Sequence, residues 1–168
     1  MAARPTGMLD PMDPLVESMR LPEAYGRPSQ TLAWDEVRGR LERAEHYWLA
    51  TVRADGRPHV VPVDAVWLDG AFHFGGHPDT LHQRILRRNP SAAVHLESAS
   101  HVVIAEGTAQ WITPSEALAG RLAAASKEKY GYVASPHAYR AGVWHLRATL
   151  VLAWTAIDRD ATRFRFAG

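Results

Sequence analysis

The sequence predicts a mainly β fold, an antiparallel barrel of six or seven strands with two or three helices in its connections. Between residues 47 and 75, three short segments alternate between apolar and other residues, which is the period of a strand with one buried face. The turn sequences ADGR and LDG separate these segments, as expected for a meander of hairpins. Strand patterns return after each later helical segment, and no parallel-sheet unit or repeat interrupts them.

The N-terminal part of the chain divides into an arm and a first helix. Residues 1–28 contain five of the eleven prolines and no sustained hydrophobic period, which predicts an extended arm ahead of one domain at 29–168. Thr31 is the expected N-cap of the helix. Apolar residues then follow at helical spacing: Trp34, Val37, Leu41 and Ala44.

The barrel strands are expected in groups that two more helices separate. The first group lies at about 47–54, 59–67 and 71–75. A helix capped by Asp79 follows, and SAAVHLES and HVVIAEGTAQWI then predict two strands. Thr113, Pro114 and Glu116 form a capping-box pattern that predicts a helix beginning at Pro114. The segments VWHLRATLVLAWTAID and TRFRF complete the predicted strands.

The middle of each predicted strand supplies the expected core. Eight residues in such positions are predicted to be largely buried: Leu49, Val52, Val61, Val63, Val94, Leu96, Val103 and Val151. Five tryptophans also fall in the strands, where packing is the expected role. A second role, lining a substrate pocket, is open to one of them or to Tyr130 or Tyr132.

Composition and charge limit the classes of function. The net charge of +1 at pH 7 is too small for a protein that mainly binds nucleic acid. The absence of cysteine excludes disulfides and thiolate chemistry. No stretch reaches the roughly 18 apolar residues of a membrane span, and no signal-peptide pattern occurs, so we expect a cytoplasmic protein without membrane contact. The nine histidines include no HExxH or related motif, and we predict no metal site.

One segment, GGHPDTLHQRILRRNP at residues 75–90, has the features of an anion site. Gly75 and Gly76 allow a ligand to approach the backbone closely, and the start of the helix carries Thr80 and His82. Unpaired backbone N–H groups and the helix dipole favour an anion there. The alternative is a plain strand-to-helix turn followed by a solvated face of arginines.

Three motifs occur in a characteristic order. DGRPHVVPV forms a strand, turn and strand, ILRRNP ends a helix before a strand, and EG lies late in a further strand. Over about residues 40–166, this order resembles the pyridoxamine 5'-phosphate oxidase-like superfamily of flavin-binding split β-barrels. The superfamily includes FMN enzymes and deazaflavin-dependent reductases. The resemblance therefore implies a split barrel that forms a homodimer and shares its cofactor across the interface.

The resemblance also implies where the flavin ring would bind. In such proteins the ring lies along the strand that matches Val60, Val61, Pro62 and Val63, and main-chain groups of this strand hydrogen-bond its pyrimidine edge. Val61 stands where some FMN oxidases carry an arginine. Some relatives have an arginine and a lysine in their closing strand. This chain retains the arginine as Arg147 and has Leu150 in place of the lysine.

The same resemblance places the cofactor phosphate beside the segment from Gly76 to Gln83. Thr80 matches the usual Ser or Thr of the family. His82 departs from it, because it replaces a lysine by a side chain that is only partly protonated at neutral pH. These departures slightly favour a deazaflavin over FMN.

The implied function is an oxidoreductase that uses the deazaflavin coenzyme F-420 or FMN to transfer a hydride to or from a small organic substrate. The cofactor performs the redox step in this chemistry, so the sequence need not supply a catalytic acid or base. The alternative is a non-enzymatic protein that binds or stores a flavin, a deazaflavin or haem on the same fold.

Overall fold

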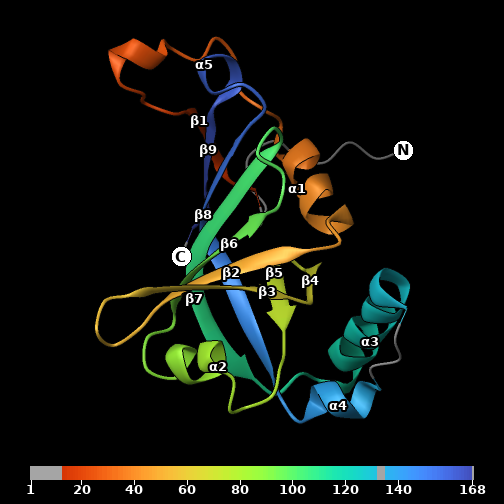
Figure 1. The fold of residues 1–168 in the computed structure, drawn as a ribbon. Helices are drawn as coiled ribbons and strands as arrows, with labels where there is room; N and C mark the ends of the chain where they lie inside the picture. Colours follow the sequence, from red (N-terminus) through yellow and green to blue (C-terminus); the bar gives the residue numbers. More distant parts are fainter. Residues whose placement is uncertain (1–12, 132–134, 168) are drawn as a thin grey trace, which may run out of the picture.

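The structure, a computed structural model, describes residues 13–131 and 135–167. In this part of the chain, nine antiparallel strands form one sheet that curls into a barrel (Figure 1). The strands are β1 (Leu15–Ser18), β2 (Tyr47–Val52), β3 (Pro58–Val63), β4 (Ala65–Leu68), β5 (Ala71–Phe74), β6 (Ser91–Leu96), β7 (Val102–Ile112), β8 (Val143–Trp154) and β9 (Thr162–Arg165). The helices are α1 (Trp34–Arg43), α2 (Leu81–Leu86), α3 (Glu116–Tyr130), α4 (Pro136–Arg140) and α5 (Ile157–Asp160), with a 3-10 turn η1 at Glu23–Tyr25.

The predicted mainly β, antiparallel split barrel is confirmed, although it contains more strands and helices than expected. The predicted strand at 59–67 is two strands, because the chain bends at Asp64 between β3 and β4. A further strand, β1, pairs with β9 and places residues 15–18 of the expected arm at the edge of the sheet. Residues 1–12 of that arm lie outside the described residues.

The strand order β1-β9-β8-β7-β6-β2-β3 explains why the barrel is split. Along one edge, β8 pairs with β7 over its whole length. Along its other edge, its first part pairs with β5 and its second part with β9, so the sheet divides there. β5 also pairs with β4, and the backbone at Asp64 then joins β4 to β3.

The EG dipeptide marks an irregularity in this barrel. The register between β7 and β8 shifts between Glu106 and Gly107, as in a β-bulge. A Cβ atom at Gly107 would collide with the carbonyl group of Arg147 on β8. Glycine is therefore required at this position because the two backbones approach each other closely.

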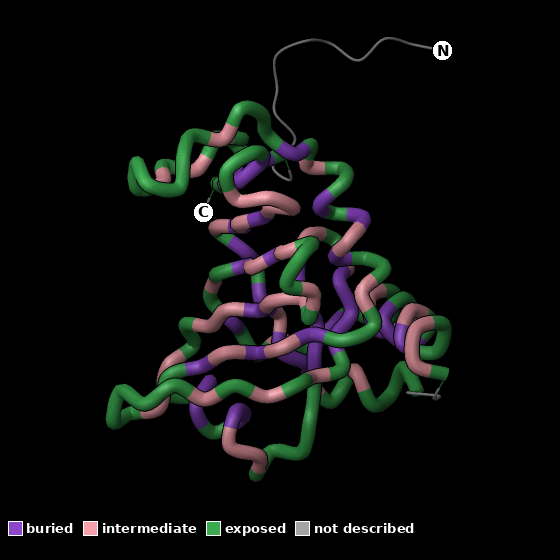
Figure 2. The backbone as a smooth tube through the Cα atoms, turned by 45° about the horizontal axis from the view of Figure 1, so that its top comes forward, coloured by how far each residue is buried: buried purple, intermediate pink, exposed green. Residues whose placement is uncertain are grey.

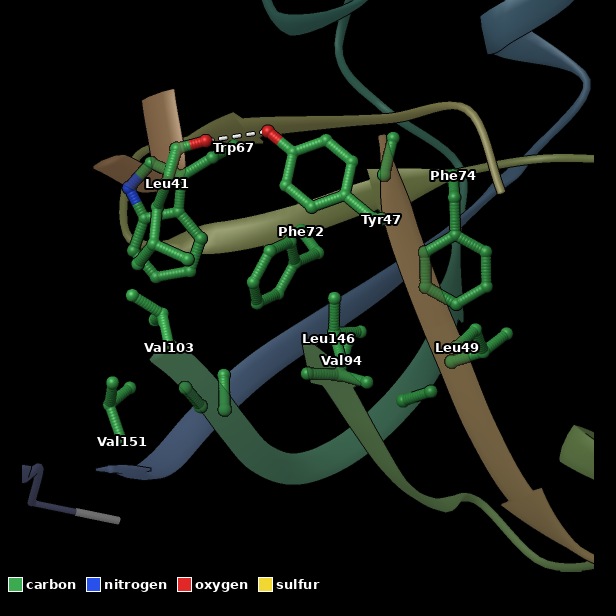
Figure 3. Close-up of a cluster of buried hydrophobic side chains, with 14 of the residues drawn as sticks. Leu41, Tyr47, Leu49, Trp67, Phe72, Phe74, Val94, Val103, Leu146 and Val151 are labelled. Atoms are coloured by element: carbon green, nitrogen blue, oxygen red, sulfur yellow. Dashed lines mark hydrogen bonds between the residues drawn. The ribbon is translucent and has the colours of Figure 1, made fainter. Parts of the chain in front are cut away.

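The barrel interior is a dense apolar core (Figure 3). Of the residues predicted to be buried, four are at most 1% exposed: Leu49, Val94, Val103 and Val151. Three others are partly buried and pack against this core: Val61, Val63 and Leu96. The prediction for Val52 is wrong, because this residue ends β2 beside the hairpin turn and is 41% exposed. Figure 2 shows the same distribution along the backbone, with buried segments in purple and mainly exposed connections in green.

Aromatic side chains fill the space between the strands. The Tyr47 ring is fully buried and meets the Phe72 ring edge to face at 5.6 Å between centroids. Its hydroxyl donates a hydrogen bond to the Leu41 carbonyl at 2.5 Å (Figure 3), which fixes the end of α1 on the barrel. It also accepts a hydrogen bond from Lys129 Nζ at 2.6 Å. Burial lowers the pKa of Lys129 to about 8.

The predicted starts of the three helices are wrong by one or two residues. α1 has Ala33 as its N-cap instead of Thr31, because the Leu32 N–H donates to Thr162 Oγ1 and holds this segment against β9. α2 follows Thr80, and no side chain, Asp79 included, caps it. α3 begins after Ser115, whose hydroxyl accepts from the Leu118 N–H at 3.2 Å. Thr113 and Pro114 instead connect β7 to α3.

α3 covers the outer face of the β4 side of the barrel. Leu122 of α3 forms a second apolar cluster with Val66 of β4 and Val143 at the start of β8. α4 packs beside α3 at the lower end of the molecule in Figure 1. Among the described residues, no helix is long and apolar enough to cross a membrane.

Candidate functional site

A cleft of about 590 Å³, which we call the main cleft, opens where β3, the β5–α2 loop, the end of β7 and α4 meet. On one side it is lined by Pro62 and Val63 of β3, by Gly75 and Gly76 of the loop, and by His82 of α2. The opposite side consists of Trp111, Tyr139, Gly142 and Val143 with two alanines. Segments distant in the sequence therefore build one mainly apolar cleft.

The β3 wall carries main-chain groups that the sheet does not use. β3 is the last strand in the sheet order, and the Arg53 N–H donates to the Arg57 carbonyl at the base of its hairpin with β2. Hydrogen-bonded pairs alternate along an antiparallel ladder, so the even-numbered positions of β3 face the free edge. Pro58 and Pro62 occupy such positions, where a missing N–H costs nothing. Val60 is then the β3 residue whose N–H faces this edge.

The turn before α2 requires glycine. Gly76 adopts a φ of 135°, and a Cβ atom there would lie 3.2 Å from both His82 Nε2 and Gln83 Nε2. At Gly75, a Cβ atom would meet no atom within 4 Å, so space is open beside the backbone. The loop thus places its backbone directly against the main cleft.

His82 lies at the base of this loop and is only 8% exposed. Burial lowers the pKa of its imidazole below the usual 6.5, so the side chain is neutral at neutral pH. Its Nε2 lies 3.5 Å from Thr80 Oγ1, and the Thr80 hydroxyl donates to the His77 carbonyl at 2.9 Å. At neutral pH, the His82 imidazole therefore lacks the positive charge that the expected charge-assisted hydrogen bond to a phosphate requires.

Gln83 and two tryptophans connect the two sides of the main cleft. Gln83 is fully buried, and its Nε2 donates to the Gly75 carbonyl at 3.0 Å while its Oε1 accepts from Trp144 Nε1 at 2.6 Å. The Trp144 ring meets the Trp111 ring edge to face at 5.5 Å. A side chain at Gly142 would collide with the Trp111 indole. Trp111 is held in this way yet remains 48% exposed.

Among the described residues that line the main cleft, there is no lysine or arginine, and Asp64 is the one carboxylate. A phosphate bound there would rely on backbone groups, on Thr80 and on a neutral imidazole. The apolar walls and glycine backbone, by contrast, suit a flat ring system. The main cleft is therefore better suited to an aromatic ring than to an anion.

The structure brings together five of the residues singled out by sequence as binding candidates, since the main cleft is lined by Pro62, Val63, Gly75, Gly76 and His82. The others lie around it: Val60 is 50% exposed at the β3 edge, Val61 packs on the core, Thr80 precedes α2, Gln83 is buried, and Arg147 is exposed on β8. Their roles in cofactor binding stay predictions.

The opposite wall was not specified by sequence. Trp111 was one of five tryptophans for which pocket lining was left open, and Tyr139 and Gly142 carry no motif. Tyr130 instead donates its hydroxyl to the Ala65 carbonyl at 2.8 Å. Tyr132 lies outside the described residues.

One histidine pair lies outside the main cleft. His73 of β5 and His145 of β8 face each other, with 3.0 Å between Nε2 and Nδ1. Burial lowers the pKa of His73 to about 4 and also lowers the pKa of His145, so both imidazoles are uncharged at neutral pH. In the part of the chain that the structure describes, no group of three or more His, Asp or Glu residues is arranged to hold a metal ion.

Comparisons with known proteins agree with this architecture. The family model described as pyridoxamine 5'-phosphate oxidase matches residues 33–156. No curated protein sequence matches the chain significantly. Among solved structures, the conserved hypothetical protein Rv2991 of Mycobacterium tuberculosis has a TM-score of 0.62 at 20% identity, over 77% of this chain and 88% of that chain.

Two further structures carry functional names. An F-420 reductase has a TM-score of 0.54 at 22% identity, over 67% of this chain and 93% of its own. HutZ, a haem storage protein from Vibrio cholerae, has a TM-score of 0.55 at 18% identity, over 68% of this chain and 89% of its own. At such low identities these similarities establish the shared fold.

Proposed function

The chain belongs to the pyridoxamine 5'-phosphate oxidase family, and from this premise we propose that it is an oxidoreductase that binds a flavin-type coenzyme in the main cleft. The coenzyme is F-420 or FMN, and the reaction transfers a hydride to or from a small organic substrate. The observation that carries the proposal is the apolar cleft between the free edge of β3 and the glycine turn. An F-420 reductase with the same fold supports it.

The chain's own residues would bind and orient the ring. The N–H of Val60 and the carbonyl of Pro62 face the free edge of β3 and are suited to the polar edge of a pyrimidine-like ring. Gly75 and Gly76 let the ring system approach the backbone. When bound, the coenzyme supplies the hydride donor or acceptor, while the protein supplies orientation and a site with little water.

The substrate would lie against the opposite wall. Trp111 presents a half-exposed indole there, and Tyr139 and Val143 lie beside it. Such a wall favours a flat or apolar substrate, because indole surfaces stack on rings and bury apolar area. The described lining residues offer a substrate no cation to pair with.

We also propose that two copies of the chain associate over this face. Trp111, 48% exposed, lines the main cleft, and Val60, 50% exposed, lies on β3 two residues before Pro62 of the same lining. Exposed apolar residues gathered at one site are typical of an interface. A symmetric partner would cover them and enclose the coenzyme.

The second candidate function is binding or storage of haem without catalysis. His82 lines the main cleft and is neutral at neutral pH, which is the form of histidine that ligates haem iron. The haem storage protein HutZ shares the fold. His82→Ala should abolish a haem Soret shift if this candidate is correct.

A side-by-side titration tests the two candidates. The purified full chain is titrated with F-420, FMN and haem, and binding is followed by absorbance and fluorescence. Micromolar or tighter binding of F-420 or FMN, with weak haem binding that His82→Ala does not change, is expected. Tight haem binding that depends on His82, with neither coenzyme bound, would replace the first candidate by the second.

A further inference from the structure

A second cleft, of about 570 Å³, lies between α2 and the β2–β3 hairpin. Its lining includes Arg53 of the hairpin, together with Arg84 and Arg88 from the α2 segment. Leu81 and Ile85 of α2 form its apolar base. We call it the arginine cleft. It uses a different face of α2 from the main cleft, into which His82 points.

One hydrogen bond joins the two sides of the arginine cleft, and another closes the hairpin on one side. Asn89 Nδ2, after α2, donates to the Val52 carbonyl at the end of β2 at 3.5 Å. The hairpin is closed by the Arg53 N–H, which donates to the Arg57 carbonyl at 2.9 Å. Asn89 therefore links the end of the α2 segment to the end of β2 beside the cleft.

The positive charges of this cleft have no matching carboxylates. Asp55 is the one carboxylate in its lining, and it is already engaged by Arg57, whose Nη2 lies 2.6 Å from Asp55 Oδ2. Hydrogen bonds from Arg57, with a smaller effect of the Arg53 charge, hold the pKa of Asp55 below its usual value. Within residues 13–131 and 135–167, no salt bridge includes Arg53, Arg84 or Arg88.

Arg53 also carries an unsatisfied donor. Its Nε is buried and has no hydrogen-bond partner in the described part of the chain. A buried donor of a charged group without an acceptor is costly, so the described chain leaves the hydrogen bonding of Arg53 incomplete beside the cleft. The planar guanidinium groups of three arginines suit the oxygens of phosphate or paired carboxylates.

We propose that the arginine cleft binds an anion with at least two negative charges, either a phosphate group or neighbouring carboxylates. Two sources can supply it: an acidic part of the coenzyme in the main cleft, or a separate phosphorylated ligand. The first source rests on the proposed function, whereas the second is independent of it. The shared chemistry is multivalent anion recognition by Arg53, Arg84 and Arg88.

The test is calorimetric titration of the full chain with inorganic pyrophosphate at low and high salt. Wild type should bind, and binding should weaken with salt because screening weakens contacts between charges. Arg84→Ala and Arg88→Ala should each weaken binding about tenfold, as expected for loss of a charge-assisted hydrogen bond. Arg88→Lys should give an intermediate loss. Arg87→Ala is the matched control, since Arg87 is also exposed but does not line the cleft.

A parallel titration with F-420 and FMN identifies the source of the anion. If Arg88→Ala weakens both pyrophosphate and coenzyme binding, the anion is part of the coenzyme; if it weakens pyrophosphate binding alone, the ligand is separate. Both results support the site. Absence of pyrophosphate binding to wild type, or equal affinities in wild type and all variants, would overturn it, even where coenzyme binding is normal.

Discussion

The residue at position 82 illustrates how burial changes the chemistry expected from a sequence. A histidine there, in place of the lysine usual in relatives, suggested a phosphate contact that strengthens on protonation. The structure buries the imidazole, and its pKa falls below the usual 6.5. Protonation therefore requires a lower pH than the sequence indicates. It also opposes folding, because the unfolded chain binds the proton more readily, so stability is full above about pH 6.5 and decreases below it.

The lowered pKa of His82 predicts how coenzyme affinity depends on pH. If His82 contacts the coenzyme phosphate, coenzyme affinity should be constant above pH 7 and should rise as pH falls below about 6.5. His82→Lys should bind more tightly at pH 7 and show little pH dependence between pH 5.5 and 8.5, since a lysine is charged throughout. Fluorescence titration checks both curves, and the melting temperature of each sample verifies folding. If the affinity of wild type is independent of pH, His82 does not contact the coenzyme phosphate.

Trp111 provides a second test at this scale. Trp111→Ala should weaken ligand binding in the main cleft about tenfold, because an aromatic contact contributes roughly 0.5–1.5 kcal/mol beyond its buried area. Trp111→Phe should retain most of the affinity. Trp48→Ala is the control, since Trp48 is a partly buried strand tryptophan that does not line the main cleft. Equal affinities for wild type and Trp111→Ala would place the ligand elsewhere.

At the scale of elements, the alternation of apolar residues predicted most strands, but not where they end. β2 and β6 lie where expected because their alternation continues over the whole strand. The bend at Asp64 divides a continuous apolar pattern, and only closure of the barrel requires a bend there. The start of α1 was wrong because a tertiary hydrogen bond, from Leu32 to Thr162, holds the segment before it. The start of α3 was wrong because Ser115, two residues beyond the expected cap, accepts the capping hydrogen bond.

β2 also yields a stability prediction. Leu49→Ala should lower the free energy of unfolding by about 2–5 kcal/mol, because it leaves a cavity in the core. Val52→Ala, at the exposed end of the same strand, should change it by at most about 0.5 kcal/mol. Urea denaturation measures both values. Similar losses for the two variants would contradict the placement of β2.

At the scale of the whole molecule, the sequence predicted one half of the site better than the other. The β3 wall and the glycine turn come from contiguous motifs, so a resemblance located them. Trp111, Tyr139 and Gly142 reach the main cleft only because β7, α4 and β8 converge at the same end of the barrel. The arginine cleft likewise depends on packing of the hairpin against α2, which no local pattern specifies.

We predict that two copies of the chain form a dimer in solution. Light scattering at micromolar concentration, with coenzyme present, should give twice the mass of one chain. Val60→Asp should shift the equilibrium towards the monomer, because it places a charge in the proposed apolar interface. Val16→Asp is the control, since Val16 is another exposed strand valine, on β1, and lines neither cleft. A monomeric mass for wild type would contradict a shared coenzyme site.

We propose that the main cleft holds the ring of a flavin-type coenzyme. The most direct measurement is a crystal structure of the protein grown with F-420 and, separately, with FMN. We expect the ring to lie between the free edge of β3 and the Gly75–Gly76 turn, with Trp111 on the facing wall. Its polar edge should be hydrogen-bonded to the Val60 N–H or the Pro62 carbonyl. A saturated coenzyme complex whose ring lies outside the main cleft would contradict it.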